Sequence, residues 1–440
     1  MTRRRRPSPR LLRTAAVAAL CTAAGASSLT GCGSLPGMAK GSDNNKPIVV
    51  MTWAPEGTKA TNMPGMPAMA QAYARWVNAS GGIHGRKLKV ITCNERNDSV
   101  QAARCAQEAG KAKAVAVVGS YSQHGRSFTS PLEVAGIPYL GGYGLTQEEF
   151  NSPYSYPVNG GQAALLAGNG RQLGSRCARV SLVRPDTIAG DELPELLDAG
   201  LKAAGREPAH DIRAPEGAGD YSSQATTALK DVGADSSLGS AAAGAELDSS
   251  CVTAALGNRT GTFFDSFRRV QEDHPKVRIA SIMGSVRQSL IDSTGGSSSP
   301  LEGTYATGWY PAPDDPRWGP MKKVINKYAF DDNRIDPDDA GTQTTWIAYT
   351  ALRSVLMSLS PDGISARTVR NALDHGHKVD TGGLTPPLRW GYNDPLNVPH
   401  YPRIVNADVT YQVVRDGRLV AVRKGFVDVA KTLERYGPRD

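Results

Sequence analysis

The segment "GGIHGRK", residues 81–87, brings together three glycines, a histidine and two basic side chains. Loops that hold phosphate have a similar composition, because glycine lets the backbone approach the anion and a lysine neutralises it. A phosphate loop follows a strand and opens a helix. Here the amphipathic helix pattern of residues 64–78 comes first, and the alternating strand pattern of residues 87–93 follows. We therefore predict a structural connection, in which glycine ends the helix and His84 is solvated.

Other motifs that carry catalytic chemistry are missing from the sequence. It contains no G-x-S-x-G nucleophile elbow, no H-E-x-x-H zinc motif and no C-x-x-C pair. The segment "DHGH", residues 374–377, holds two histidines separated by one residue, but a metal would need further ligands. We interpret this segment as a solvated helix end, and we expect no catalytic residue, no metal and no cofactor.

The first 31 residues have the pattern of an export signal. Six arginines and no acid open the chain, and the apolar run of residues 11–26 is too short for a membrane span. The segment "LTGC", residues 29–32, matches the bacterial lipobox, so we expect Cys32 to carry a lipid and to become the first residue. Residues 33–46 are small and polar, which is typical of a flexible tether. The sequence leaves the general secretory route and the twin-arginine route open.

The positive charge of the chain belongs to this signal. The formal net charge is +8, and removing the six arginines of the signal leaves +2. No basic patch with interleaved aromatic residues occurs, so we expect no nucleic-acid partner. No later stretch approaches the roughly 20 apolar residues of a membrane span. About 394 residues follow the tether, which is enough for two lobes.

Strand and helix patterns alternate along the rest of the chain. Buried-strand runs stand at residues 47–53, 114–119 and 136–142, with helical stretches between them. The same alternation returns over residues 178–284. It predicts parallel sheets that are covered by helices on both faces. A long apolar helix at residues 340–359 and a hairpin around Asp416–Gly417 follow.

Four cysteines remain outside the signal and the lipid site: Cys93, Cys105, Cys177 and Cys251. An even number of cysteines in an exported protein suggests two disulfides. Four cysteines allow three pairings, and the residues alone do not choose among them. Buried free thiols are the alternative.

The segment "WVNASGGIHGRKLKV" resembles the "IN-x-x-GGI-x-GRK" segment of branched-chain amino-acid-type solute-binding proteins of ABC importers. Similar segments follow in order, "AVAVVGSYS", "VAGIPYLGG", "LEGTYATGWYPAPDDP" and "DTGGLTPPLRWG", so the resemblance spans most of residues 47–425. It implies an α/β protein with the type I periplasmic-binding fold, in which three crossover segments join two doubly wound parallel-sheet lobes. The expected lobes are residues 47–160 with 308–391, and residues 161–307 with 392–440. In bacteria without an outer membrane, members of this family are lipoproteins.

The resemblance also implies a disulfide pairing. Cys93 ends a strand and Cys105 lies in the following helix, which is similar to the local disulfide in the family's first lobe. Cys177 and Cys251 belong to strands that are neighbours in a sheet of order 2-1-3-4-5, where adjacent strands lie about 4.8 Å apart. We therefore expect the pairs Cys93–Cys105 and Cys177–Cys251.

In a fold of this kind the ligand lies between the lobes, against loops at the carboxyl ends of strands. In the first lobe this position selects "GSYSQ", where Ser122 matches the family's carboxylate-binding serine and Ser120 and Tyr121 are adjacent candidates. Hydroxyl and backbone N–H groups at the start of a helix suit a carboxylate. The next loop brings Gly142 and Tyr143 to the same edge. Glycine and serine also end strands for purely steric reasons, which is the structural alternative.

The second lobe departs from the family's pattern. Asp186 and Thr187 are the polar residues after its first strand, and Val286 stands where amino-acid-binding members place an acid for the ligand's ammonium group. A buried ammonium without a carboxylate would cost several kcal/mol, so we do not expect an ordinary branched-chain amino acid as ligand. Trp309 and Tyr310, at the second crossover, either form an aromatic wall of the site or pack the hinge.

Three functions are compared. The first is a monomeric lipoprotein on the outer face of the cell membrane, which captures a small organic, amino-acid-like molecule and delivers it to an ABC permease. The second is a ligand-sensing lipoprotein with the same fold and no role in transport. The third is a secreted α/β hydrolase, which the missing nucleophile elbow disfavours.

Overall fold

The structure is a computed structural model that describes residues 46–59, 61–187, 190–233, 248–271, 277–282 and 285–435. All of these residues fall within one unit of the chain, Asp43–Asp440. The predicted signal, Cys32 and the tether up to residue 45 lie outside the described residues. No helix in the described ranges is long and apolar enough to cross a membrane.

The first sheet is the parallel sheet that the alternating pattern predicts, with the strand order β2-β1-β3-β4-β5. Its two faces follow from the period-two alternation of β1. Ile48 and Val50 pack in the core beneath α1, whereas Met51 and Trp53 pack toward α2 and α3. The strands are β1 (Ile48–Ala54), β2 (Leu88–Asn94), β3 (Val117–Val118), β4 (Tyr139–Leu140) and β5 (Ser155–Tyr156).

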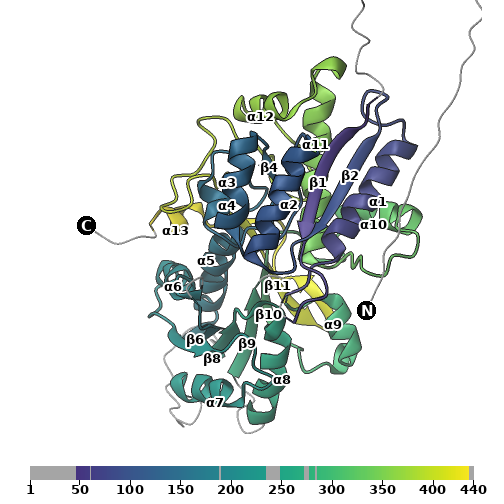
Figure 1. The fold of residues 1–440 in the computed structure, drawn as a ribbon. Helices are drawn as coiled ribbons and strands as arrows, with labels where there is room; N and C mark the ends of the chain where they lie inside the picture. The colour runs from purple at the N-terminus through teal and green to yellow at the C-terminus, as the bar shows by residue number, and fades with distance from the viewer. Residues whose placement is uncertain are drawn as a thin grey trace, which may run out of the picture. The chain divides into compact units, whose positions relative to one another are not determined.

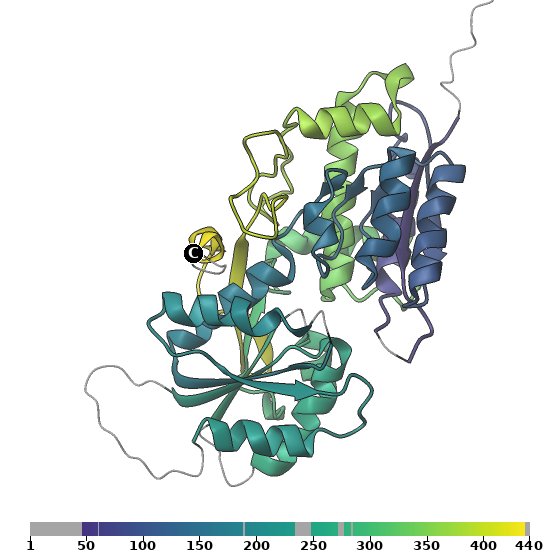
Figure 2. The same cartoon turned by 60° about the vertical axis from the view of Figure 1, so that its left-hand side comes forward.

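Helices from two separate parts of the chain cover this sheet. All the apolar residues that predict an amphipathic helix in α1, at positions 66, 69, 70, 73 and 77, are buried. The late helix α11 packs against α1 and β3, and it stands among the elements of the first sheet in both views (Figures 1 and 2). We call this sheet and its helices the first lobe. The helices are α1 (Gly65–Ala79), α2 (Ser99–Lys111), α3 (Gly125–Ala135), α4 (Glu148–Asn151), α10 (Gly319–Tyr328), α11 (Ala340–Ser358) and α12 (Ala366–Asp374).

The strands β3 and β4 are shorter than their apolar runs predict. Each ends at a glycine with a left-handed backbone, Gly119 at φ +57° and Gly141 at φ +64°. A Cβ atom at Gly119 would lie 2.9 Å from the Cα atom of Thr345, and one at Gly141 would lie 2.4 Å from the Cβ atom of Ala348. The close approach of α11 therefore requires glycine at both strand ends.

The segment "GGIHG" is a connection between α1 and β2, as its place between helix and strand predicts. Gly82 donates its backbone N–H to the Val77 carbonyl at 2.9 Å and ends the helix. His84 and Gly85 both have positive φ and close a two-residue turn between Ile83 and Arg86. The prediction that His84 is solvated is wrong: its ring is half-buried, and Nε2 lies 3.1 Å from the Leu356 carbonyl oxygen of α11.

The second sheet has the order β12-β11-β10-β9-β8-β6-β7. Its parallel part, β7-β6-β8-β9-β10, is the predicted 2-1-3-4-5 arrangement. The chain returns to this sheet at β11 and adds two antiparallel strands at the edge, with β13 paired to β11. The strands are β6 (Cys177–Pro185), β7 (His210–Ala214), β8 (Asp248–Ala254), β9 (Val277–Ile282), β10 (Tyr305–Gly308), β11 (Asp408–Arg415), β12 (Arg418–Ala421) and β13 (Val427–Asp428).

Helices cover both faces of the second sheet, as the teal ribbons in Figure 2 show. Leu182 of β6 packs in the core with α5 and α6, whereas its neighbour Val183 packs in the core with α7 and α8. We call this sheet and its helices the second lobe. The helices are α5 (Gly161–Gly174), α6 (Leu193–Ala203), α7 (Ser222–Asp231), α8 (Thr260–Gln271), α9 (Gln288–Ser293) and α13 (Ala430–Glu434).

The predicted hairpin and both predicted disulfides are confirmed. Asp416 and Gly417 have φ of +53° and +71°, so both central residues of the β11–β12 turn adopt the left-handed backbone of a tight hairpin. Cys93–Cys105 joins the end of β2 to α2, with Cα atoms 5.8 Å apart. Cys177–Cys251 joins the neighbouring strands β6 and β8, with Cα atoms 5.9 Å apart.

Candidate ligand site

Loops of both lobes enclose a cavity of about 320 Å³, which we call the cleft cavity. On the first lobe the loops after β3 and β4 contribute, and on the second lobe the loops after β6 and β8 contribute. The carboxyl ends of parallel strands are where ligands bind in open α/β sheets, and the volume suits a small molecule. The lining residues are Thr61, Tyr121, Gln123, Leu145, Thr146, Gln162, Pro185, Thr187, Gly190, Leu193, Glu216, Tyr221, Ala255, Leu256, Gly257 and Arg259.

Tyr121 and Tyr143 stand together at this edge of the first lobe. Their ring centroids are 5.1 Å apart, and each backbone N–H is held by the sheet, Tyr121 by the Trp53 carbonyl and Tyr143 by the Ser120 carbonyl. Burial raises the pKa of Tyr121 to about 12, so its phenol stays neutral. Tyr121 lines the cleft cavity, and both rings line an adjoining cavity of about 270 Å³.

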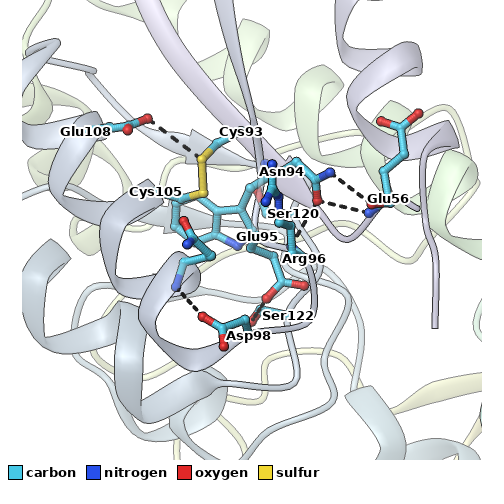
Figure 3. Close-up of a disulfide and its surroundings, with 12 residues drawn as sticks. Glu56, Cys93, Asn94, Glu95, Arg96, Asp98, Cys105, Glu108, Ser120 and Ser122 are labelled. Atoms are coloured by element: carbon cyan, nitrogen blue, oxygen red, sulfur yellow. Dashed lines mark hydrogen bonds between the residues drawn. A yellow bond between two sulfur atoms is a disulfide. The ribbon is translucent and has the colours of Figure 1, made fainter. Parts of the chain in front are cut away.

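The two candidate serines are engaged inside the protein. The Ser120 hydroxyl accepts the Trp53 N–H at 3.1 Å. The Ser122 hydroxyl donates to Oε2 of Glu95 at 3.1 Å (Figure 3). It also accepts the backbone N–H of His124 at 3.1 Å. Both residues are at most 1% exposed, and neither lines the cleft cavity. The structure therefore gives these hydroxyls a role in positioning the loop that carries Tyr121.

Glu95 connects this loop to the first disulfide. It stands two residues after Cys93, is fully buried, and also accepts the Asn97 backbone N–H at 3.0 Å. Desolvation raises the pKa of its carboxyl group. Figure 3 shows Glu95 near the disulfide and its hydrogen bond with Ser122. The hydrogen bond of Glu95 thus links the segment after β2 to the loop that carries Tyr121, which sequence reasoning did not foresee.

Gly142 and the loop after it are positioned by a second buried acid. Oxygens of Glu149 accept the backbone N–H groups of Gly144, Leu145 and Thr146 at 3.1, 2.9 and 3.1 Å. A Cβ atom at Gly142 would lie 2.3 Å from Oε2 of Glu149, so glycine is required there. Desolvation raises the pKa of Glu149 to about 7, against the effect of the three N–H donors. The spacing of Thr146 and Glu149 is that of a capping box, a signal from which this residue could have been found.

The second-lobe candidates differ in whether they line the cleft cavity. Thr187 lines the cleft cavity, and its hydroxyl accepts the backbone N–H of Gly190 at 3.1 Å. Asp186 is more than half exposed, lies 3.6 Å from the Arg213 guanidinium and does not line the cleft cavity. Val286 is 2% exposed and packs in the core of the second lobe.

Trp309 and Tyr310 pack at the second crossover. The Trp309 indole donates to the Gly161 carbonyl at 2.9 Å, and its ring lies 5.1 Å from that of Tyr143. The Tyr310 hydroxyl lies 2.9 Å from both Asn159 Nδ2 and Thr344 Oγ1. Both residues line a separate cavity of about 50 Å³, and neither lines the cleft cavity. Trp309 therefore packs against the Tyr143 ring without lining the cleft cavity.

Sequence reasoning missed the charged and aromatic residues that the loop after β8 and the start of α7 bring to the cleft. Arg259 lies in a single 3-10 turn, Gly257–Arg259, and Tyr221 stands directly before α7. Both line the cleft cavity. Arg287, in the adjoining cavity, lies 3.6 Å from both Asp336 and Asp339 of the first lobe. The rule that ligands meet strand ends, applied to β7, β8 and β9, points to these loops.

The histidines of "DHGH" lie away from the cleft cavity. His375 is exposed, with Nδ1 2.6 Å from the Asn371 carbonyl oxygen, and Nε2 of His377 lies 3.0 Å from the Ser354 hydroxyl. Tyr156 donates to Asp374 at 2.7 Å. Within the described ranges, no three His, Cys, Asp or Glu side chains are grouped so that they could hold a metal ion.

Comparisons with known proteins agree with this fold. The model of the periplasmic binding protein family matches residues 49–398. A search of curated protein sequences finds no match. Among solved structures, a possible leucine/isoleucine/valine-binding protein from Rhodopirellula baltica SH 1 is 13% identical with a TM-score of 0.68, covering 88% of this chain and 98% of that one.

Two ligand-bound structures are also similar to this chain. A branched chain amino acid ABC transporter from Thermus thermophilus with bound valine is 15% identical with a TM-score of 0.68, and the match covers 89% of this chain and 99% of that one. A solute binding protein from Rhodopseudomonas palustris BisB5, in complex with 3,4-dihydroxy benzoic acid, is 16% identical with a TM-score of 0.62, covering 87% and 97%.

The two parallel sheets of order 2-1-3-4-5, with helices on their faces, define the type I periplasmic-binding fold. This chain belongs to the periplasmic binding protein family and is related to the substrate-binding proteins of branched-chain amino-acid-type ABC transporters. The family consists of extracytoplasmic proteins that bind small molecules and work with ABC permeases.

Proposed function

We propose that this protein captures a small organic molecule in the cleft cavity and delivers it to the permease of an ABC importer. The observation that carries the proposal is the cavity of about 320 Å³, which residues of both lobes line at the carboxyl ends of their strands. A ligand that contacts both lobes binds the closed form more tightly than the open form, so it raises the closed population. A permease that binds the closed form can then recognise the loaded protein.

Contacts between the lobes around this cavity support closure over a ligand. Gln147 of the first lobe donates its amide to Glu192 of the second lobe, and Glu192 also accepts the Tyr401 hydroxyl at 3.1 Å. On the far side of the cavity, Arg259 reaches the Lys59 carbonyl at 3.4 Å. These polar contacts are exposed or half-buried, so each is individually weak and an opening motion would break few of them.

The ligand contacts that we propose are Tyr121, Thr187 and the backbone around Tyr143, with Gly142, Ser120 and Ser122 as the residues that position these loops. Asp186 stays a candidate at the mouth of the loop after β6, and Trp309 and Tyr310 support Tyr143. The neighbours with bound valine and bound 3,4-dihydroxy benzoic acid indicate that this fold accommodates carboxylates both with and without an ammonium group. No catalytic residue is proposed, since the serine hydroxyls near the cleft are engaged within the protein.

We further propose that Cys32 carries the lipid anchor after removal of residues 1–31, that residues 33–46 form the tether, and that the chain works as a monomer at the outer face of the cell membrane. The lobes are proposed as residues 47–160 with 308–391, and residues 161–307 with 392–440. The packing of α11 on α1 and of β11 on β10 supports this discontinuous division.

A thermal-shift screen tests the capture function. Amino acids, amides, small aromatic acids, fatty acids and sugars are each added to the full chain in detergent. A ligand present at a hundred times its Kd stabilises the folded state by about 2.7 kcal/mol and raises the unfolding midpoint. An unchanged midpoint with every class would contradict the proposal.

A further inference from the structure

The arginines near the cleft differ in their partners. Arg184 lies 2.7 Å from Asp191 and 2.8 Å from Asp211, and Arg287 lies 3.6 Å from Asp336 and from Asp339. Their charges are thus neutralised within the protein. Arg259 forms no ion pair with any residue of the described ranges, and its hydrogen bond to the Lys59 carbonyl is long, at 3.4 Å.

The backbone around Arg259 is held in place, although its guanidinium has no ion-pair partner among the described residues. The turn Gly257–Arg259 runs directly into α8, and the Thr260 hydroxyl accepts the backbone N–H of Leu256 at 3.2 Å. Arg259 itself is half-buried and lines the cleft cavity. Its guanidinium, with five N–H donors in a planar fork, matches the geometry of a carboxylate.

The rest of the cavity wall suits an apolar body. Leu145 of the first lobe and Leu193 and Leu256 of the second lobe line it, together with the rings of Tyr121 and Tyr221. Each tyrosine hydroxyl has a partner within the protein, since Tyr121 accepts the Gln123 amide at 3.2 Å and Tyr221 donates to the Pro215 carbonyl at 2.9 Å. A ligand with one anionic end and an apolar body would satisfy both the arginine and these walls.

The only carboxylate among the residues that line the cleft cavity is Glu216, and it is exposed. A solvated carboxylate gains little from an ammonium group, because exposed ion pairs are weak and screened by salt. The position where amino-acid-binding relatives would supply an acid holds the buried Val286. The cavity therefore offers a strong site for a carboxylate and only a weak one for an ammonium group.

We propose that the ligand is an apolar or aromatic monocarboxylate, whose carboxylate binds Arg259 and whose body lies against Tyr121, Tyr221 and the three leucines. This inference rests on the proposed capture function and names its substrate class. It reverses the orientation that the sequence suggested, in which the first lobe's serine loop receives the carboxylate.

Matched compounds test the proposal by isothermal titration of the full chain in detergent. The probes are 3-phenylpropanoate and hexanoate, their neutral amides, and L-phenylalanine. We expect at least one acid to bind about tenfold or more tighter than its amide, because a charge-assisted bidentate pair is lost in the amide. We expect L-phenylalanine to bind no more than about tenfold tighter than 3-phenylpropanoate.

Substitutions of Arg259 test whether this residue causes the preference for the acid over the amide. Arg259→Gln should reduce the preference for acid over amide to near one, and Arg259→Lys should retain part of it. Arg268→Gln, on the helix α8 that follows the turn of Arg259, removes the same charge away from the cleft cavity and should change nothing, because Arg268 is paired with Asp265 at 2.9 Å. Unfolding midpoints of all variants should match the wild type, since Arg259 makes one long hydrogen bond.

The outcomes separate this inference from the function on which it rests. Binding of a neutral compound with equal affinity in Arg259→Gln would overturn the carboxylate assignment and leave capture intact. A large preference for the amino acid over its des-amino analogue would overturn it too, because the ammonium group would then be recognised. Absence of binding by every acid, with no response to any class in the thermal-shift screen, would contradict both.

Discussion

The buried acid Glu149 makes the stability of this protein depend on pH. It is 2% exposed, and desolvation raises the pKa of its carboxyl group from 4.5 to about 7. Between these two values the folded protein keeps a proton that the unfolded chain has released. The free energy of unfolding therefore falls as the pH rises from 4.5 to 7, by about 3 kcal/mol from this group alone, and is flat above 7.

Urea unfolding of the wild type and of Glu149→Gln from pH 5 to pH 8 measures this effect. The glutamine is neutral throughout, so the free energy of unfolding of the wild type should decrease relative to the variant by about 3 kcal/mol as the pH rises. Glu148→Gln, at the neighbouring and more exposed position, is the control and should show no such trend. A wild type that gains stability relative to Glu149→Gln with rising pH would refute the reasoning, since the three N–H donors would then outweigh desolvation.

Three further predictions concern packing, disulfides and the anchor. Gly141→Ala should lower the free energy of unfolding, measured in urea, by about 2–4 kcal/mol, because the new Cβ atom would lie 2.4 Å from α11. Gly57→Ala is the control, since Gly57 also has positive φ but has no atom within 4 Å of the new Cβ position. It should lower the free energy of unfolding by only about 1 kcal/mol. Loop-closure entropy predicts a loss of about 4.5 kcal/mol when Cys177–Cys251 is replaced by two alanines and about 3 kcal/mol for Cys93–Cys105, and equal losses in denaturation would contradict it. Cys32→Ser should release the protein from membranes into the medium, and continued retention in the membrane fraction would exclude the lipid anchor.

The fold could be predicted because it depends on local patterns. The spacing of Met66, Met69 and Tyr73 places their side chains on one face of a helix, and all three are buried. The order of strands and helices restricts the topology, since parallel strands need crossover helices. The disulfide Cys177–Cys251 was expected from the strand order that the family resemblance implies, in which β6 and β8 are neighbours. These features need no knowledge of side-chain contacts between distant segments.

The site could be predicted only in part, because its roles depend on such contacts. The loop containing Ser122 lies at the predicted edge of the sheet, but its hydroxyl donates to Glu95, 27 residues earlier in the chain. The lengths of β3 and β4 depend on the approach of α11, more than 200 residues later in the chain. Arg259 carries no motif, and only its position after β8 and its lack of an acidic partner in the described ranges mark it.

The central claim is that the cleft cavity is the ligand site, and a cavity-filling substitution tests it most directly. Leu145 lines the cavity and is half-buried at the margin of the core, so Leu145→Trp should fill part of the cavity. Val134→Trp, at a position that is 91% exposed on α3, is the matched control. Isothermal titration with the tightest ligand of the thermal-shift screen should show affinity weakened by about 100-fold in Leu145→Trp and unchanged in Val134→Trp. Wild-type affinity in Leu145→Trp would contradict the account.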